Sequence, residues 1–297
     1  MRDPPLVGTT ASERSPGATD PVVEGSETGV SRFRISRFGE AGEELCDDAV
    51  VREEPLEIQL GGASLTVVMR TPGHDRELVL GFMVTERVIS RPEQVESVRH
   101  ATQVRDPASL DNVVRVVLAP GVGVDLESLR RNFYSSSSCG VCGKASIENV
   151  LASAPPLSDD CRFSSAFFLG LVERLEGAQT LFGSTGGLHA AGLFGPDGKL
   201  LVAREDVGRH NAVDKVVGWA LQGGRVPLAG HVLMVSGRVS YEIVQKARMA
   251  GVPVVAAVSA PTSLAIEFAD AAGLTLVGFL RGRGFNVYCG RGRIDAG

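Results

Sequence analysis

Hydrophobic and polar positions in the first half of the chain follow short, mixed patterns. Apolar and polar side chains alternate at period two on either side of Gly61 and Gly62, which predicts a hairpin of two half-buried strands. A run with apolar residues at helical spacing follows. Residues 31–130 are therefore expected to form a small α+β domain. The predicted elements are strands at 52–60 and 63–69, a helix at 75–87 and a strand at 112–118.

From residue 166 onward, nearly continuous apolar runs alternate with segments of helical periodicity. Such runs are typical of strands that are buried on both faces, and their alternation with helices predicts a sheet with parallel segments. The fold class expected for residues 166–290 is α/β, with a mixed sheet and helices on both faces. Expected strands lie within 200–208, 231–237, 252–259 and 274–280, and expected helices at 211–221, 241–250 and 263–272.

The ends of these four predicted strands are chemically alike. Ligands of such sheets bind outside the carboxyl ends of the strands. Each end offers small or hydroxyl residues that let a ligand approach backbone N–H groups, and three carry arginine, which suits phosphate. For any single turn, strand termination and helix capping explain these residues better than a ligand site does. Four such turns on one edge favour a phosphate-bearing ligand. The four ends are residues 204–210, 236–240, 259–262 and 281–284.

Length and charge restrict the class of protein. A chain of 297 residues exceeds what one compact core usually absorbs, so two domains are expected. The net charge of −5 argues against nucleic-acid binding.

Residues 1–30 are polar and rich in Pro and Gly, without the apolar run of a signal peptide, which predicts a disordered tail. The longest apolar runs are strand-sized, so we expect a cytoplasmic protein without a membrane segment.

Two of the five cysteines form a C-x-x-C pair, Cys139 and Cys142, behind four serines. An odd number of cysteines in a chain of this size indicates a reducing compartment. Structural zinc needs four ligands, and the other cysteines are scattered singly, so no metal is expected. A thioredoxin-like pair directly follows a buried strand, whereas this pair follows a polar run that predicts a mobile loop. Lys144 and the start of a predicted helix favour the thiolate, and a reactive thiolate on such a loop suits a carrier that reaches from one partner to another.

Zinc deaminases give a third use for such a pair, because they combine an H-x-E sequence with P-C-x-x-C. Here His189 follows a predicted strand, but Ala191 occupies the position of the glutamate that moves protons. The cysteines also precede the histidine, which is the wrong order. Deamination is therefore not expected, although the fold can be shared.

Five short segments combine glycine, arginine and the cysteine pair along the chain. They are residues 137–143 (SSCGVCG), 185–191 (TGGLHAA), 204–215 (REDVGRHNAVDK), 236–240 (SGRVS) and 278–288 (GFLRGRGFNVY). Together they resemble the formate dehydrogenase accessory sulfurtransferase family, FdhD. The resemblance runs from about residue 50 to residue 288. Five motifs in one order are far more specific than a single C-x-x-C.

The resemblance implies a sulfurtransferase that accepts persulfide sulfur from a cysteine desulfurase. It further implies delivery of that sulfur to the molybdenum cofactor that carries two molybdopterin guanine dinucleotides (Mo-bisMGD), which formate dehydrogenase requires. A cytidine-deaminase-like fold without the zinc site, a homodimer, and apo formate dehydrogenase as a partner are also implied.

The same resemblance assigns roles to residues. Cys139 is expected to hold the persulfide, and Cys142 to assist its transfer or release. Both lie in residues 131–165, where a loop and a linker helix are expected. The family's guanine-dinucleotide site falls on Phe279, Leu280, Arg281, Gly282, Arg283 and Gly284, where arginines can meet pyrophosphate and glycines let the backbone approach it. Weaker candidates at another strand end are Asp206, Arg209, His210 and Asn211.

Two other classes of function stay open. A cytosolic dithiol oxidoreductase would need both cysteines equally and no nucleotide. A non-catalytic cofactor chaperone would bind the guanine nucleotide and carry no sulfur.

Overall fold

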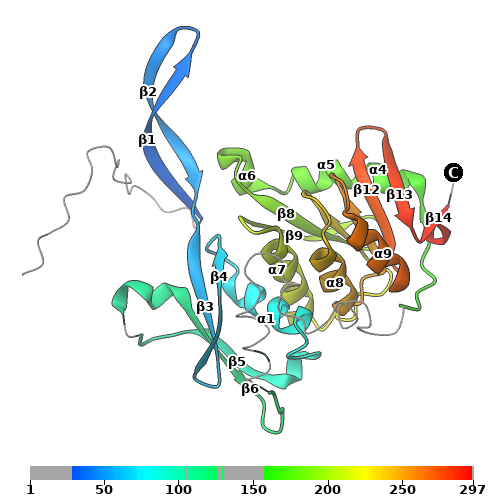
Figure 1. Ribbon diagram of the computed structural model, residues 1–297, viewed down its shortest axis with the longest axis horizontal. Helices are drawn as coiled ribbons and strands as arrows, with labels where there is room; N and C mark the ends of the chain where they lie inside the picture. The colour runs from blue at the N-terminus through cyan, green and yellow to red at the C-terminus, as the bar shows by residue number, and fades with distance from the viewer. Residues whose placement is uncertain (1–28, 105, 126–128, 130–156, 296–297) are drawn as a thin grey trace, which may run out of the picture.

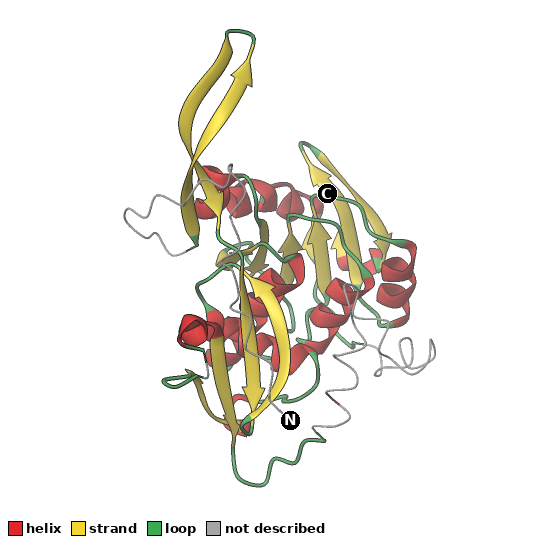
Figure 2. Ribbon diagram, turned by 60° about the vertical axis from the view of Figure 1, so that its left-hand side comes forward, coloured by secondary structure: helices red, strands yellow, loops and turns green. Residues whose placement is uncertain are grey.

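The computed structural model describes residues 29–104, 106–125, 129 and 157–295. Its elements form two units and an arm that projects from them (Figures 1 and 2). Nearly all of the predicted tail and the Cys139–Cys142 pair lie outside the described residues.

The N-terminal unit is a four-stranded sheet in the order β4-β3-β6-β5, against which α1 packs. The first two strands form the predicted hairpin, and both Gly61 and Gly62 have the positive φ that a two-residue turn favours. The four predicted elements are present, and β5 is a further strand. The bounds are β3 Glu54–Leu60, β4 Ala63–Arg70, α1 Asp75–Thr85, η1 Pro92–Gln94, β5 Val95–His100, η2 Pro107–Asn112 and β6 Val113–Leu118.

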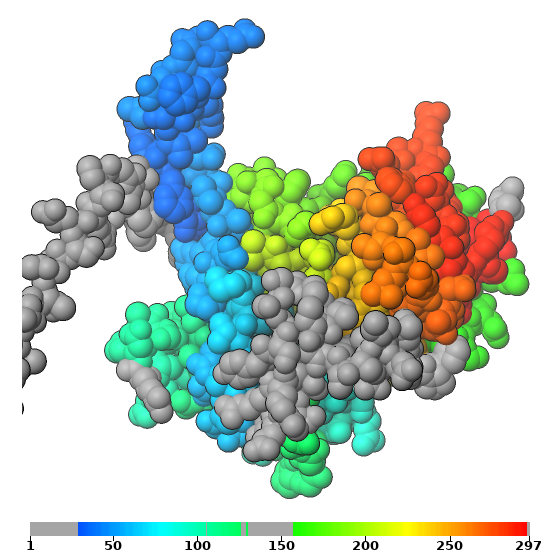
Figure 3. Space-filling view, in the orientation of Figure 1, coloured from blue at the N-terminus to red at the C-terminus, as the bar shows by residue number. Residues whose placement is uncertain are grey.

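A long hairpin of β1 (Val30–Gly39) and β2 (Gly42–Val51) projects from the body as an arm (Figures 1 and 3). Its two strands pair antiparallel along their whole length. Side chains of Phe33 and Ile35 are half-buried on one face of the ribbon, while most other positions are exposed. The base of the arm contacts α6 (Thr180–Thr185).

The C-terminal unit is built on a six-stranded mixed sheet in the order β13-β12-β11-β10-β8-β9. Strands β9, β10, β11 and β12 run in one direction, and β8 and β13 run in the other. This is the predicted α/β class. The bounds are β8 His189–Phe194, β9 Leu200–Asp206, α7 Arg209–Gln222, β10 Val232–Val235, α8 Tyr241–Met249, β11 Val254–Ala257, α9 Ser263–Ala271, β12 Thr275–Arg281 and β13 Gly284–Cys289.

Helices cover both faces of this sheet (Figure 2). Successive side chains of a strand point to opposite faces, and Leu233 of β10 accordingly joins the core under α7, α8 and α9. Its neighbour Met234 joins a second core with Phe168 and Leu171 from α4 and α5. Both faces of the sheet are therefore buried. The remaining elements are β7 Phe163–Ser164, α4 Ser165–Leu169, α5 Leu171–Glu176, η3 Arg291–Arg293 and β14 Ile294–Asp295.

The two units meet where α1 crosses α7 at a pair of glycines. A Cβ on Gly81 would overlap the backbone carbonyl of Asp214, and a Cβ on Gly218 would overlap that of Glu77. Glycine is unfavourable in the middle of a helix, so its presence at both contact points indicates that close approach of the backbones outweighs helix propensity.

We expect Gly81→Ala to lower the free energy of unfolding by about 2–3 kcal/mol, because the added methyl group forces the two helices apart. Gly183→Ala in α6 is the matched control, since a Cβ there meets no atom within 4 Å. Urea denaturation of the full chain measures both. Equal stability of the two variants would contradict the packing argument.

Candidate functional site

The carboxyl ends of β9, β10, β11 and β12 lie along one edge of the sheet, as predicted. These strands share a direction, and the amino end of β8 lies at the same edge, with His189 paired to Asp206. The predicted strand before His189 is wrong, because helix α6 precedes β8 there. Every strand end that the sequence singles out therefore borders this carboxyl edge.

The predicted guanine-dinucleotide segment forms the turn between β12 and β13. Arg281 and Arg283 are both exposed at the turn, and Gly282 has a φ of 60°, which favours glycine. The guanidinium of Arg281 lies 5.2 Å from the centre of the Phe279 ring. Leu280 is buried in the core, so only its backbone can reach a ligand. The turn thus offers two exposed cations to solvent.

Phe279 itself has a positive φ of 52°, which is uncommon for a residue with a side chain. Its N–H donates to the carbonyl of Ser259, 3.1 Å away, which ties the turn to the end of β11. The unusual backbone bends β12 next to a bulge, where its pairing with β13 shifts in register. The bend directs the arginine turn away from the regular sheet.

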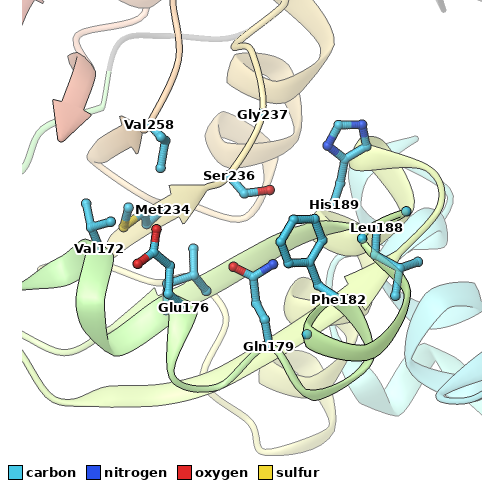
Figure 4. Close-up of a pocket in the computed structure, with 14 residues that line it drawn as sticks. Val172, Glu176, Gln179, Phe182, Leu188, His189, Met234, Ser236, Gly237 and Val258 are labelled. Carbon is cyan, nitrogen blue, oxygen red and sulfur yellow. The ribbon is translucent and has the colours of Figure 1, made fainter. Parts of the chain in front are cut away.

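A pocket of about 690 Å³ opens at the carboxyl edge, between the ends of β10 and β11 and the α5–α6 segment (Figure 4). We call it the edge pocket. Its wall is mostly apolar, and Ser236 and Gly237 line it on the strand side. The side-chain oxygen of Ser236 accepts the N–H of Ala190 at 2.9 Å, which fixes the loop after β10. Residues drawn around it include Val172, Phe182, His189, Met234 and Val258.

Cationic groups surround His189 at one end of the edge pocket. Burial lowers the pKa of His189, and the positive charges of Arg209 and Arg238 lower it further. The lowered pKa favours the neutral form of the ring at pH 7. The edge pocket thus combines an apolar wall with a concentrated positive charge, in a chain whose net charge is −5.

Asp206 and Asn211, two of the weaker candidates, serve the structure of this edge. Asp206 is fully buried, and its carboxylate lies 2.7 Å from the ammonium of Lys215. It also accepts the backbone N–H groups of Thr71 and Gly208 and the amide of Asn211. These bonds join the N-terminal unit to the start of α7. A carboxylate with so many partners has little capacity left for a ligand.

His210 lies on the other side of the same turn, in a pocket of about 480 Å³ between the two units. Its Nε2 is 3.2 Å from the hydroxyl of Ser240 and 3.8 Å from the carboxylate of Glu242. Burial is the main cause that lowers the pKa of His210 to about 3, with nearby positive charge from Arg209 next. A neutral histidine is therefore built into the junction of α7 and α8.

The cysteines of the C-x-x-C pair lie outside the described residues. The first described residue after them, Leu157, donates its N–H to the carbonyl of Ala272 just before β12, at the edge opposite the arginine turn.

Burial raises the pKa of Cys161 to about 12 and that of Cys289 to about 11, so both thiols stay protonated near pH 7. Neither is a ready nucleophile.

Metal and membrane features are absent from the described part of the chain. In residues 29–104, 106–125, 129 and 157–295, no three His, Cys, Asp or Glu side chains gather in a way that could hold a metal ion. Helices within those ranges are also too short or too polar to cross a bilayer. Because the cysteine pair is outside them, the absence of a bound metal stays a prediction.

A mixed sheet covered by helices, with a pocket and arginines at its carboxyl edge, defines the class of this molecule as an α/β protein. The chain belongs to the FdhD/NarQ family, whose model matches residues 51–295. It is 51% identical to the "Sulfur carrier protein FdhD" of Mycolicibacterium paratuberculosis, over 89% of this chain and 98% of the relative. The protein of the same name from Sulfolobus acidocaldarius is 42% identical, over 90% and 99%.

A crystal structure of a Desulfotalea psychrophila protein, provisionally described as a formate dehydrogenase accessory protein, shares the fold. The TM-score is 0.70 at 24% identity, and the match covers 90% of this chain and all of that one. The structural match and the family match therefore both cover nearly all of the described chain.

The neutral His210 predicts a specific loss of stability in acid. Its pKa is about 3 in the folded protein and about 6.5 when unfolded, so the unfolded chain binds the extra proton between those values. Stability contributed by this group is complete above pH 6.5 and falls as the pH drops. The expected loss at pH 5 is about 2 kcal/mol.

Urea denaturation at pH 7.5 and pH 5 tests this expectation on the parent and on His210→Gln, which cannot take up the proton. We expect the parent to lose about 2 kcal/mol more than the variant over that interval. Identical pH dependence of the two proteins would show that His210 is readily protonated in the folded state.

Proposed function

We propose that the protein is a sulfur carrier that takes persulfide sulfur on Cys139 and delivers it to the Mo-bisMGD cofactor for formate dehydrogenase. Membership of the FdhD/NarQ family over residues 51–295 is the observation that carries the proposal. The names of relatives that are about half identical over most of the chain support the sulfur-carrying role. The cationic carboxyl edge supports an anionic acceptor.

Sulfur loading requires one exchange at Cys139. Its thiolate attacks the outer sulfur of the persulfide on a cysteine desulfurase, the S–S bond of the donor breaks, and the donor cysteine leaves as a thiolate. Cys139 then carries the extra sulfur as a persulfide, with no net oxidation. The high pKa values of Cys161 and Cys289 make these two thiols poor nucleophiles for this exchange.

Cys142 is proposed to assist release. When its thiolate attacks the inner sulfur of Cys139, the persulfide bond breaks and the terminal sulfur leaves as sulfide. The two cysteines are oxidised to a disulfide in this step, and the sulfur is reduced. A cellular dithiol reductant must then restore the pair before the next cycle.

The acceptor is proposed to bind at the carboxyl edge, with pyrophosphate at the turn of Arg281 and Arg283. Exposed guanidinium groups can each donate two parallel hydrogen bonds to phosphate oxygens. Gly282 and Gly284 have no side chains to block the backbone, and a Cβ at either position would meet no atom within 4 Å. A large dinucleotide can therefore approach the turn freely.

A homodimer and an encounter with apo formate dehydrogenase complete the proposal, as the resemblance implies. The arm supports a protein partner, because Phe38 and Leu45 are 75% and 61% exposed on it. A two-stranded ribbon with exposed apolar side chains is marginal in water unless another surface covers it.

Incubation with a cysteine desulfurase and cysteine should add the mass of one sulfur atom to the parent, and Cys139→Ser should abolish that addition. Cys142→Ser should still load, because it keeps the accepting thiolate. Intact mass spectrometry measures all three proteins. Loading of Cys139→Ser to the parent level would reject Cys139 as the acceptor, and loading of none of them would favour a cofactor chaperone.

Replacing both Arg281 and Arg283 by Ala should weaken GDP binding by about 10-fold to 100-fold, because each charged hydrogen-bonding group contributes roughly 1.4 kcal/mol or less at an exposed site. Sulfur loading of the same variant should be normal, since it needs only the cysteine segment and the donor. Titration calorimetry with GDP decides the point. An affinity equal to that of the parent would show that these arginines are solvated turn residues.

A further inference from the structure

One face of the arm formed by β1 and β2 is open to solvent, and the arm stands clear of both units (Figures 1 and 3). Residues that lie opposite each other in an antiparallel pair point to the same face. Three such pairs, all six residues of which are exposed, make up what we call the open face. They are Arg34 with Asp47, Ser36 with Leu45, and Phe38 with Glu43.

Apolar side chains on the open face are unusually exposed. Phe38 is 75% and Leu45 is 61% exposed, and they are the two most exposed large apolar residues of the described chain. The opposite face is less open, because Phe33 and Ile35 are half-buried there. A two-stranded ribbon is marginally stable in water by itself, so covering the open face would stabilise the arm.

Charges on the arm are sorted by strand. Strand β1 contains three arginines and no acidic residue, and β2 contains four carboxylates and no basic residue. They are Arg32, Arg34 and Arg37 in β1, and Glu43, Glu44, Asp47 and Asp48 in β2. Two arms that paired edge to edge through the same strand would bring like charges together, which opposes an extended sheet. Edge pairing of unlike strands is head-to-tail and does not close into a dimer by a two-fold axis.

The open face is complementary to a second copy of itself. A two-fold axis parallel to the strands lays β1 of one arm over β2 of the other. Arg34 then faces the partner's Asp47, and Phe38 lies diagonally across from the partner's Leu45. An axis across the strands would instead lay β1 over β1, arginine against arginine. The sorting of charge therefore selects the first arrangement, in which every contact occurs twice.

The ion pair within one arm gains partners in this arrangement. Nη1 of Arg34 lies 3.4 Å from Oδ1 of Asp47, and the two side chains are 56% and 57% exposed. An exposed pair of this kind contributes little by itself, but several charges in a network contribute more. Two copies would form a ring of four alternating charges beside the apolar contact of Phe38 and Leu45.

We infer that the open face of the arm binds a second copy of this chain, with the two-fold axis along the ribbon. The inference rests on the proposed function, because it supplies an interface for the homodimer proposed there. Strands of ten residues give a face about 33 Å long and about 10 Å wide. That area is smaller than the roughly 800 Å² per partner of a standard interface, so the association is reversible and depends on concentration.

Charge reversals in the full chain test the arrangement. Arg34→Asp and Asp47→Arg each place like charges opposite one another when the variant pairs with itself. In an equimolar mixture of the two variants, opposite charges face each other again. Arg162→Asp is the matched control, because Arg162 and Asp295 form an exposed ion pair of 3.2 Å away from the arm.

The apolar contact is tested by Phe38→Ser combined with Leu45→Ser. Val67→Ser is its control, since Val67 is 57% exposed on the N-terminal sheet. All of these side chains are exposed in the single chain, so the variants should fold, and circular dichroism checks that they do.

Sedimentation equilibrium over a range of protein concentrations measures the dimer dissociation constant. The account predicts a reversible dimer of the parent and a rise of about tenfold or more for each charge reversal and for the apolar double variant. The mixture should return to within about threefold of the parent, and both controls should match it. A parent that stays monomeric, parent-like dimers of all arm variants, or a mixture that fails to recover would each overturn the inference. Sulfur loading on Cys139, measured on the same samples, reports separately on the proposed carrier function.

Discussion

The contact of α1 with α7 is the constraint on which the arrangement of this protein depends. At Gly81 and Gly218 the helix backbones touch directly, so the N-terminal unit is held at one distance from the sheet. Beside this contact, the guanidinium of Arg204 donates to both carboxylate oxygens of Glu77 in α1. The start of α7, which borders the carboxyl edge, is thereby fixed by a unit that contributes little to the edge pocket itself.

Buried charges reinforce this contact on both sides. Lys215 pairs with Asp206 next to Thr71, and Lys246 of α8 pairs with Asp214 and contacts Thr85 of α1. Ion pairs of this kind add little net stability, but breaking one leaves an uncompensated charge in the interior. They therefore favour a single arrangement of the two units. This arrangement also fixes Arg209 and His210, because they begin α7 just after the turn that follows Asp206.

Much of the C-terminal sheet could be predicted from the sequence, because continuous apolar runs reveal strands buried on both faces. The run at 252–259 encloses β11, and the run at 274–280 covers β12 except for its last residue, Arg281. The shared direction of four strands puts the predicted turns on one edge. Strand β8 was harder to predict because the small residues Ala190, Ala191 and Gly192, which follow His189 at its start, show no clear period. In the arm, the apolar Phe33 and Ile35 alternate with Arg32 and Arg34. This period-two pattern is the feature of the sequence that could have predicted strand β1.

The candidate site could be predicted only in part. Motifs indicate the cysteine pair and the arginine turn, but nothing in the sequence shows that α5 and α6 close a pocket over the ends of β10 and β11. Residues such as Phe182 and Met234 have the pattern of ordinary core side chains. Among the described residues, the buried Nε of Arg209 has no hydrogen-bond partner, while the carboxylate of Asp206 pairs with Lys215. Only the folded structure shows which cation Asp206 pairs with.

Acceptance of sulfur at Cys139 and binding of an anionic ligand at the carboxyl edge are proposed as two parts of one function. They form one function only if sulfur passes from Cys139 to a ligand bound at that edge. The most direct measurement loads the protein with radiolabelled sulfur, removes the donor, and adds Mo-bisMGD. The account predicts that label leaves Cys139 only when the cofactor is present and then travels with it. Label that stays on the protein, or that is lost equally without the cofactor, would contradict a sulfur carrier for this cofactor.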